Sequence, residues 1–449
     1  MGSRQGDTWA PGNLGTVPRR SARSAVDTCL AQIDRHDGVV RAWVAIDREG
    51  ARRAADALDA GAHAGSPPGP LHGMPVALKD IFDVAGWPTT SGAAPFAHRL
   101  PEHDAPAVSR LRAAGAVILG KTVTTEFAFA DPSITRNPWN PEHTPGGSSS
   151  GSAAAVAARM ADAALGSQTI GSTIRPAAYC GIVGFKGTYG RITTEGVTPL
   201  AWSLDHVGIF ARSVDDAARV FVALAGEPDA GADEPAAPPV TPGGPGAPPS
   251  PPRFAVPRAW VRSLAAPEVQ THLDEVLAVL RRAGAHVEDI ELPPSASRID
   301  ADGRLVLRVE AAAYHSRWFP QHASEYGRKI RALVESGQAV TATAYVHAHE
   351  TRSAFRREMS AVFQDHDVLL LPAAPSTAPP LSEETTGDPV FCAPWTFAGF
   401  PALALPSGLS ARGLPLSTQL VGPVAGDARL LEVGRWCEAH FRFTAAPPL

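Results

Sequence analysis

The sequence predicts an α/β fold, in which one large domain has a mixed central β-sheet covered by helices. Short apolar runs typical of buried strands alternate with helical segments along most of the chain. A stretch rich in Pro, Gly and Ala interrupts this alternation at 227–252, but strand-like and helix-like segments resume after it. We therefore favour a single domain, residues 1–449, with 227–252 as an exposed insertion loop, over two domains joined by a linker.

The first part of the chain predicts three helices and three strands. Helical periodicity marks the helices, and short apolar runs mark the strands. The third strand follows a helix and a glycine, an order typical of α/β layers. The helices are expected at Ala22–Arg35, Arg48–Ala60 and Ala105–Ala114, and the strands at Trp43–Ile46, Pro75–Lys79 and Ala116–Leu119.

The middle of the chain predicts two loops around a helix. A polar loop is expected at Asp131–Ser150, an alanine-rich helix without internal breakers at Ser152–Leu165, and a second loop at Gly166–Arg175. The remaining elements are an apolar segment at Ile182–Phe185, a helix at Asp215–Ala225 capped by Ser213, strands at Phe254–Val256, Val287–Leu292 and Val368–Leu371, a helix at Pro267–Ala283, a hairpin of Ala402–Pro406 and Leu416–Val421, and a closing helix at Asp427–Phe441.

Bulk properties exclude several classes of protein. The formal net charge of -5 argues against nucleic-acid binding, which calls for basic clusters. No apolar run approaches the roughly 20 residues of a membrane span, and the N-terminus lacks the pattern of a secretory signal. The four cysteines are widely spaced, which fits neither a disulfide framework nor a zinc site. We expect a cytoplasmic protein without a nucleic-acid or membrane partner.

Three segments carry residues suited to catalysis. Gly146–Ser152 holds four serines and three glycines directly before a predicted helix, Gly166–Ser172 follows that helix, and Lys79 ends a buried strand. A loop before a helix presents free N–H groups, which stabilise an oxyanion and disfavour a nearby positive charge. A lysine kept neutral there could act as a base for a serine nucleophile. Composition alone leaves open a flexible connector for each loop and a solvated strand end for Lys79.

These residues resemble a known family. The segment Gly146–Ala158, together with Gly171-Ser172 and Arg175–Gly181, resembles the amidase signature, and Pro75–Asp80 is similar to the lysine strand of that family. Further matches lie at Gly120–Thr122, Ser203–Gly208 and Gln419–Pro423. The resemblance as a whole covers roughly residues 25 to 440. The resemblance implies the amidase-signature fold.

The resemblance also implies a mechanism. Lys79 would be the base, Ser148 would relay the proton from a non-proline cis peptide, and Ser172 would attack the carbonyl to form an acyl-enzyme. Ser148 would then protonate the leaving amine, and water would hydrolyse the acyl-enzyme without a metal or an organic cofactor. Family members are often dimers, so a homodimer is implied. The oxyanion would bind to the backbone N–H groups of Thr169, Ile170, Gly171 and Ser172.

The chain departs from the usual pattern of the family at three positions. Ile170 replaces the first of two glycines before the nucleophile, and its β-branched side chain would narrow the site or reshape the oxyanion hole. Gln168 stands where Asp is common, and Arg175 falls three residues after Ser172 instead of two. This placement of Gln168 and Arg175 is known among family members. The candidate residues of the substrate pocket are Ala128, Phe129, Gly147 and Trp395, with core packing an equal alternative for Phe129 and Trp395.

Two further motifs offer competing interpretations. Gly147–Gly151 fits the nucleophile elbow G-x-S-x-G with Ser149 at its centre, but that motif needs a preceding strand, and a proline-broken loop precedes it here. Ser149 is therefore expected to be a structural hydrogen-bonding residue. His347 and His349 suggest a metal site, yet residues two apart on a helix face different sides, so we expect a solvated helix face.

The predicted function is hydrolysis of the C–N bond of a small or medium neutral amide, with aryl amides and carbamates (urethanes) as extensions of the same acyl chemistry. One alternative is a glutaminase-type subunit of an amidotransferase complex that feeds ammonia to a partner modifying charged tRNA. The other is a catalytically silent relative that binds amides, which Ile170 suggests and the retained Lys79, Ser148 and Ser172 oppose.

Overall fold

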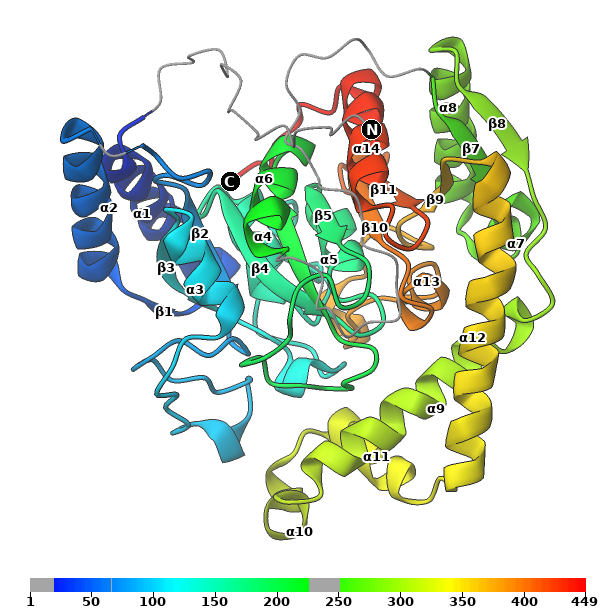
Figure 1. Ribbon diagram of the computed structural model, residues 1–449, viewed down its shortest axis with the longest axis horizontal. Coiled ribbons are helices and arrows are strands. Elements are labelled where there is room, and N and C mark those ends of the chain that lie inside the picture. Colours follow the sequence, from blue (N-terminus) through cyan, green and yellow to red (C-terminus); the bar gives the residue numbers. More distant parts are fainter. Residues whose placement is uncertain (1–19, 66, 226–250) are drawn as a thin grey trace, which may run out of the picture.

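A computed structural model describes residues 20–65, 67–225 and 251–449, and these residues form one mixed sheet of 11 strands (Figure 1). The strand order is β1-β3-β2-β4-β6-β5-β10-β11-β9-β7-β8. The strands are β1 (Trp43–Ile46), β2 (Pro75–Lys79), β3 (Val117–Thr122), β4 (Ala163–Gln168), β5 (Val183–Lys186), β6 (His206–Ala211), β7 (Arg253–Val256), β8 (His286–Asp289), β9 (Val368–Pro372), β10 (Ala402–Leu409) and β11 (Pro415–Val421).

Fourteen α-helices accompany the sheet in the described ranges. They are α1 (Ala22–Val40), α2 (Arg48–His63), α3 (Pro106–Ala113), α4 (Ser150–Ala157), α5 (Ile174–Cys180), α6 (Val214–Leu224), α7 (Arg258–Leu264), α8 (Pro267–Arg282), α9 (Ala296–His315), α10 (Phe319–His322), α11 (Arg328–Gln338), α12 (Ala342–Asp365), α13 (Ala393–Phe397) and α14 (Asp427–Phe441). The predicted α/β fold with a mixed sheet in a single domain is confirmed.

The helices cover both faces of the sheet. Gly184 and Phe185 are neighbours on β5 and so face opposite sides. A Cβ on Gly184 would lie 2.5 Å from Ala177 of α5, whereas the Phe185 ring packs against Phe221 of α6, with ring centroids 4.9 Å apart. Helices α4 and α5 therefore share one face, and α6 packs on the other with α3 and α14 beside it.

The predicted insertion at 227–252 falls outside the described residues, apart from its last two positions. The elements on either side of it belong to one structure, because α6 packs on β6 and β5, and β7 pairs with β8 and β9 of the same sheet. The alternation that resumes after the insertion thus extends the first sheet and does not start a second one.

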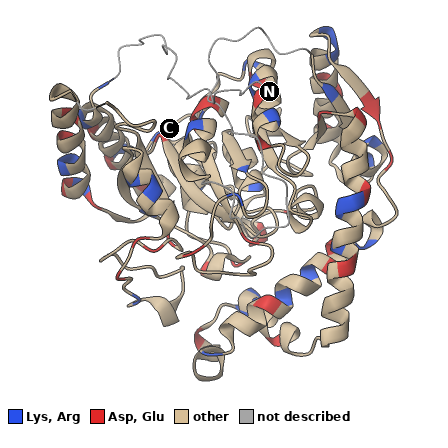
Figure 2. Cartoon of the chain, in the orientation of Figure 1, with Lys and Arg blue, Asp and Glu red and all other residues tan. Residues whose placement is uncertain are grey.

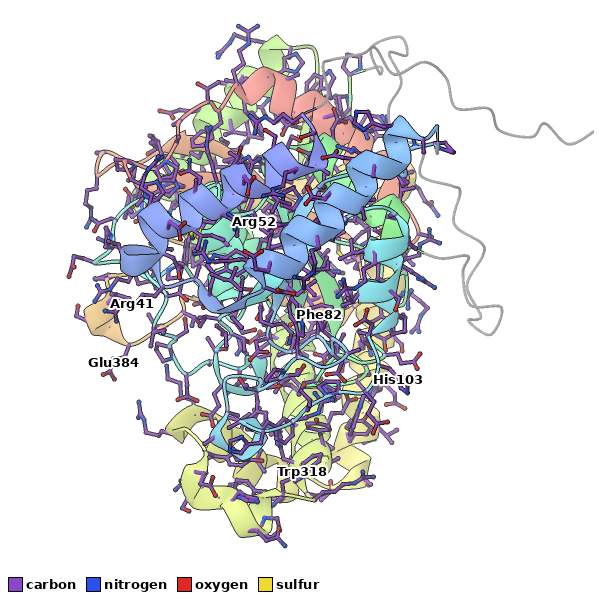
Figure 3. The ribbon with its side chains drawn as sticks, turned by 90° about the vertical axis from the view of Figure 1, so that its left-hand side faces the viewer. Arg41, Arg52, Phe82, His103, Trp318 and Glu384 are labelled. Atoms are coloured by element: carbon purple, nitrogen blue, oxygen red, sulfur yellow. The ribbon has the colours of Figure 1, made fainter. Side chains whose placement is uncertain are left out.

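Helices α11 and α12 each pack against α9, and the three helices extend away from the sheet as a helical arm (Figure 1). Lys, Arg, Asp and Glu are concentrated on the outer helices, and the strands of the centre are largely free of them (Figure 2). In the side view, α1 and α2 lie next to each other, joined by an ion pair of Arg52 with Asp27 (3.0 Å) (Figure 3). Trp318, labelled in the same view, lies between α9 and α10 at the end of the arm. No helix within the described ranges is long and apolar enough to cross a membrane.

Most predicted elements are confirmed, but the alanine-rich helix is wrong in its second half. Helix α4 ends at Ala157, Arg159 turns the chain with a φ of 59°, and the next alanines belong to strand β4. Every residue of α4 and β4 is buried, so neither segment has the polar face that would reveal its periodicity. The predicted loop at Gly166–Arg175 is shortened in turn, because β4 continues to Gln168 and α5 begins at Ile174.

Candidate active site

The ends of two neighbouring strands bring the candidate residues together. Strands β2 and β4 pair in parallel, with Leu78 opposite Leu165, so their carboxyl ends meet at one edge. Lys79 is the last residue of β2, and the chain beyond β4 leads through a short loop to Ser172. Ser148 lies just before α4, which packs on β2 and β4. The structure therefore brings Lys79 and Ser148 into direct contact, and it places Ser172 in the loop at the same edge of the sheet without a hydrogen bond to either of them.

Lys79 lies in a pocket of hydroxyl groups. Its side chain is fully buried, and its Nζ donates to Ser148 Oγ (2.7 Å) and to Ser167 Oγ (2.8 Å). Burial lowers the pKa of Lys79 to about 7, and the charge of Asp205 opposes this effect only in part. A neutral amine is therefore accessible near neutral pH, and it faces a serine hydroxyl whose proton it can accept.

Arg175 holds the backbone beside Ser148. The peptide bond between Gly147 and Ser148 is cis, and the Gly147 carbonyl accepts a hydrogen bond from Arg175 Nη2 (2.7 Å). The same side chain donates to the Gly387 carbonyl (2.8 Å), so it links this loop to the segment before α13. The unusual position of Arg175 in the sequence therefore has a structural role in fixing the Ser148 loop.

Four consecutive backbone N–H groups, the last of them that of Ser172 itself, have no hydrogen-bond partner in the part of the chain that the structure describes. The backbone N–H groups of residues 169 to 172 make no hydrogen bond to any described residue. The next two, of Thr173 and Ile174, donate to Gln168 Oε1 at 2.8 and 2.9 Å. Ser172 keeps 8% of its surface exposed, and its Oγ has no partner among the described residues. This arrangement leaves donors free for an oxyanion next to an accessible hydroxyl.

Gln168 and Thr396 brace this loop. Gln168 Nε2 donates to Thr396 Oγ1 (2.9 Å), and Thr396 Oγ1 donates to the Ile170 carbonyl (2.7 Å). Glutamine can accept from the N–H groups of Thr173 and Ile174 and also donate to Thr396, because its side-chain amide has both an acceptor and a donor. Thr396 and Ser167 were missed from the sequence, because their roles depend on contacts between segments that are distant in sequence or lie on different strands.

Ile170 is compatible with the backbone of the loop. Its φ is not positive, so a β-branched side chain meets no conformational barrier, and the side chain packs half-buried against the core. Gly171 is the position that requires glycine, since a Cβ there would lie 2.9 Å from Pro389 Cβ and 3.2 Å from Cys392 Cβ. The four free N–H groups remain in place with Ile170 present.

The competing motifs take structural roles. Ser149 Oγ donates to the Ser167 carbonyl and accepts from the Ser167 N–H, both at 3.2 Å, so it ties its loop to β4. His347 and His349 lie on α12, and the described residues contain no group of three or more His, Cys, Asp or Glu side chains placed to hold a metal ion. The four cysteines are free and buried.

Comparison with known proteins agrees with this geometry. The family model described as Amidase matches residues 24–431. The chain belongs to the amidase family. It is 36% identical to a glutamyl-tRNA(Gln) amidotransferase subunit from Roseiflexus sp. (strain RS-1), over 93% of this chain and 92% of the relative. A solved amidase structure is 33% identical with a TM-score of 0.84, covering 94% of this chain and 96% of the other. The peptide amidase from Stenotrophomonas maltophilia is 29% identical, with a TM-score of 0.80 and 95% of each chain covered.

A cavity of about 300 Å³ lies beside the candidate site: Ser167, whose hydroxyl accepts from Lys79 Nζ, and Thr169 line it, whereas Lys79, Ser148 and Ser172 do not. Ala128, one of the predicted pocket residues, also lines it. The backbone at Phe127 and Ala128 has φ values of 45° and 57°, a left-handed conformation that is uncommon for residues other than glycine. Contacts with the helical arm hold this segment: Asp131 accepts from the N–H groups of Lys329 and Ile330 at the start of α11.

The other three predicted pocket residues do not line this cavity of the amidase. Trp395 is fully buried, and its ring packs against Trp260 and Phe355, which makes it a core residue. Gly147 faces Thr386 and contributes its carbonyl to the contact with Arg175. Phe129 is partly buried against the hydrophobic core, next to Ala128. The core alternative is therefore favoured for Trp395 and Phe129.

Proposed function

We propose that this protein hydrolyses the C–N bond of carboxylic amides through an acyl-enzyme on Ser172. The observation that carries the proposal is the contact of Lys79 Nζ with Ser148 Oγ at 2.7 Å, in a buried pocket where the pKa of the lysine falls to about 7. A base of this pKa is matched to catalysis near neutral pH. The amidase family membership supports the same reaction class.

The contact between Lys79 and Ser148 supports the first of the proposed steps. Neutral Lys79 takes the proton of Ser148, Ser148 takes that of Ser172, and the Ser172 oxygen attacks the carbonyl carbon. The oxyanion binds to the N–H groups of residues 169 to 172, which are each free to donate. As the C–N bond breaks, Ser148 protonates the amine and recovers its proton from Lys79. Water then hydrolyses the ester and releases the carboxylic acid.

Release of p-nitroaniline from a panel of acyl anilides, with aryl carbamates alongside, tests this proposal. We expect hydrolysis by the parent that is abolished in Ser172→Ala and Lys79→Ala. Ser149→Ala is the matched control, because its hydroxyl contacts only the backbone of Ser167 and its loss should leave activity within about tenfold. Full activity of Ser172→Ala would refute the assignment, and the carbamates would decide whether urethanes are substrates.

A second candidate function is that of a glutaminase-type subunit in an amidotransferase complex. The relative from Roseiflexus, named as such a subunit, supports it with 36% identity over nearly the whole chain. Strict dependence on glutamine and copurification with a partner would favour this function. Turnover of acyl anilides by the isolated chain, with no gain on adding glutamine, would favour the independent amidase.

A further inference from the structure

The cavity beside Ser167 and Thr169 has acidic and hydroxyl-bearing side chains among mostly uncharged lining residues. Its two carboxylates belong to Asp205 and Glu195, and none of its lining residues is Lys or Arg. His206 also lines it, but burial holds the pKa of this imidazole well below its ordinary value, so the ring is neutral. The hydroxyl groups in the wall come from Ser167, Thr169, Thr194 and Thr198.

The two carboxylates occupy different depths. Asp205 is buried, and its oxygens accept from Thr169 Oγ1 (2.5 Å) and from the N–H groups of Leu200 (2.8 Å) and Ala201 (3.0 Å). Glu195 is exposed, and its carboxylate makes no hydrogen bond or ion pair with the described residues. One acidic group of the lining is therefore buried and fixed by hydrogen bonds, and the second is exposed and free to meet a ligand.

An aromatic side chain adds apolar surface to the same cavity. Trp202 is a lining residue with 49% of its surface exposed, and its ring meets Tyr314 of α9 edge-on at 5.9 Å. A large exposed indole at a cavity wall offers stacking area to a planar or aliphatic group. The surface thus favours an apolar body over a strongly hydrated anion.

We propose that this cavity selects substrates by charge: the part of the amide that occupies it is uncharged or carries an amine, and a carboxylate there is rejected. A carboxylate entering the cavity would lose its hydration with no Lys or Arg among the lining residues to pair with, and it would face Asp205 and Glu195. An ammonium group could instead pair with Glu195. This inference rests on the proposed function and sets its substrate class apart from free glutamine, whose α-carboxylate is an anion.

Two matched series of 4-nitroanilides test the inference, one with a carboxylate, a neutral group or an amine on the acyl side, the other with the same groups on the amine side. In at least one series, kcat/KM of the carboxylate member should be at least tenfold below that of the neutral member. Glu195→Lys should narrow this difference at least threefold, Glu195→Gln should act in the same direction, and Glu335→Lys should not change it. Glu335 provides the same change of net charge at an exposed site on α11.

Binding separates this inference from the proposed reaction. Calorimetric titration of Ser172→Ala with the same compounds reports the charge preference whether or not the parent turns them over. Weaker binding of the carboxylate member that Glu195→Lys relieves would support the charge selection even if the proposed hydrolysis fails. Equal binding of carboxylate and neutral members in both series would overturn it, whatever the outcome for hydrolysis.

Discussion

Lys79 and Lys121 lie on neighbouring parallel strands, β2 and β3, and both side chains are buried, yet only Lys121 has a carboxylate in contact with its amine. Lys121 Nζ pairs with the Asp80 carboxylate at 2.9 Å, whereas Lys79 Nζ contacts only the hydroxyls of Ser148 and Ser167. Burial lowers the pKa of both lysines, and at Lys121 the carboxylate opposes it. A hydroxyl-lined pocket makes a base, while an adjacent carboxylate makes a structural ion pair.

A third buried lysine shows that a lowered pKa is not sufficient. Lys186 Nζ donates to the carbonyls of Gly187 (3.1 Å) and Phe400 (2.5 Å), and burial lowers its pKa to about 7, as at Lys79. Carbonyl oxygens carry no proton to give up, so this amine has nothing to deprotonate. The geometry that distinguishes Lys79 is its contact with serine hydroxyls, which carry a proton that the amine can accept.

The largest expected effect is on activity, and it should follow from replacing Lys79 but not from replacing Lys121. Lys79→Met should lower kcat by about 10³-fold, because the loss of a general base costs about 10² to 10⁴ in rate. Its melting temperature should stay near that of the parent or rise. The pKa of Lys79 is depressed on folding, so the buried amine subtracts stability as pH falls from its unfolded value toward about 7. A thermal scan beside the kinetic assay checks both; an unchanged kcat would contradict the assignment of the base.

Lys121→Met should have the opposite effects: it should lower stability and leave kcat almost unchanged. Removal of Lys121 leaves the Asp80 carboxylate buried without its cation, and breaking a buried pair costs about 3–5 kcal/mol of unfolding free energy. The protein that does fold should keep a kcat close to that of the parent. Urea unfolding followed by circular dichroism measures the loss. An unfolding free energy of Lys121→Met within about 1 kcal/mol of the parent would show that the pair with Asp80 contributes little to stability, against the expected loss for a broken buried pair.

The sequence indicated Lys79 as the base but did not predict the ion pair of Lys121. Strand β2 was predicted with its observed bounds because an apolar run ends in Lys79, and α14 was predicted from Asp427 to Phe441 as observed. The alanine run that holds β4 was assigned to a helix, because alanine has the highest helix propensity and the segment has no polar face. The partners of a lysine depend on strand pairing over long distances, which local patterns do not determine.

A new carboxylate in the Lys79 pocket should keep the lysine protonated, as the Asp80 carboxylate favours the charged form of Lys121. Ser167→Asp places an acid beside Lys79 Nζ, where the serine hydroxyl lies at 2.8 Å. An adjacent carboxylate raises the pKa of a lysine by about 1–3 units, so activity at pH 7 should fall about tenfold or more and recover at higher pH. Ser167→Asn has the same shape without the charge and should keep the profile of the parent. Identical profiles for the two variants would show that charge in this pocket does not control the base.

The most direct test of the central claim is the pH dependence of kcat/KM for an acyl anilide. The claim is that neutral Lys79 activates Ser172 through Ser148. Since the unprotonated amine is the active form and its pKa lies at about 7, activity should rise with pH through about 7 and level off above it. The residual activity of Lys79→Met should lack this limb. A flat profile for the parent, or the same limb in Lys79→Met, would contradict the account.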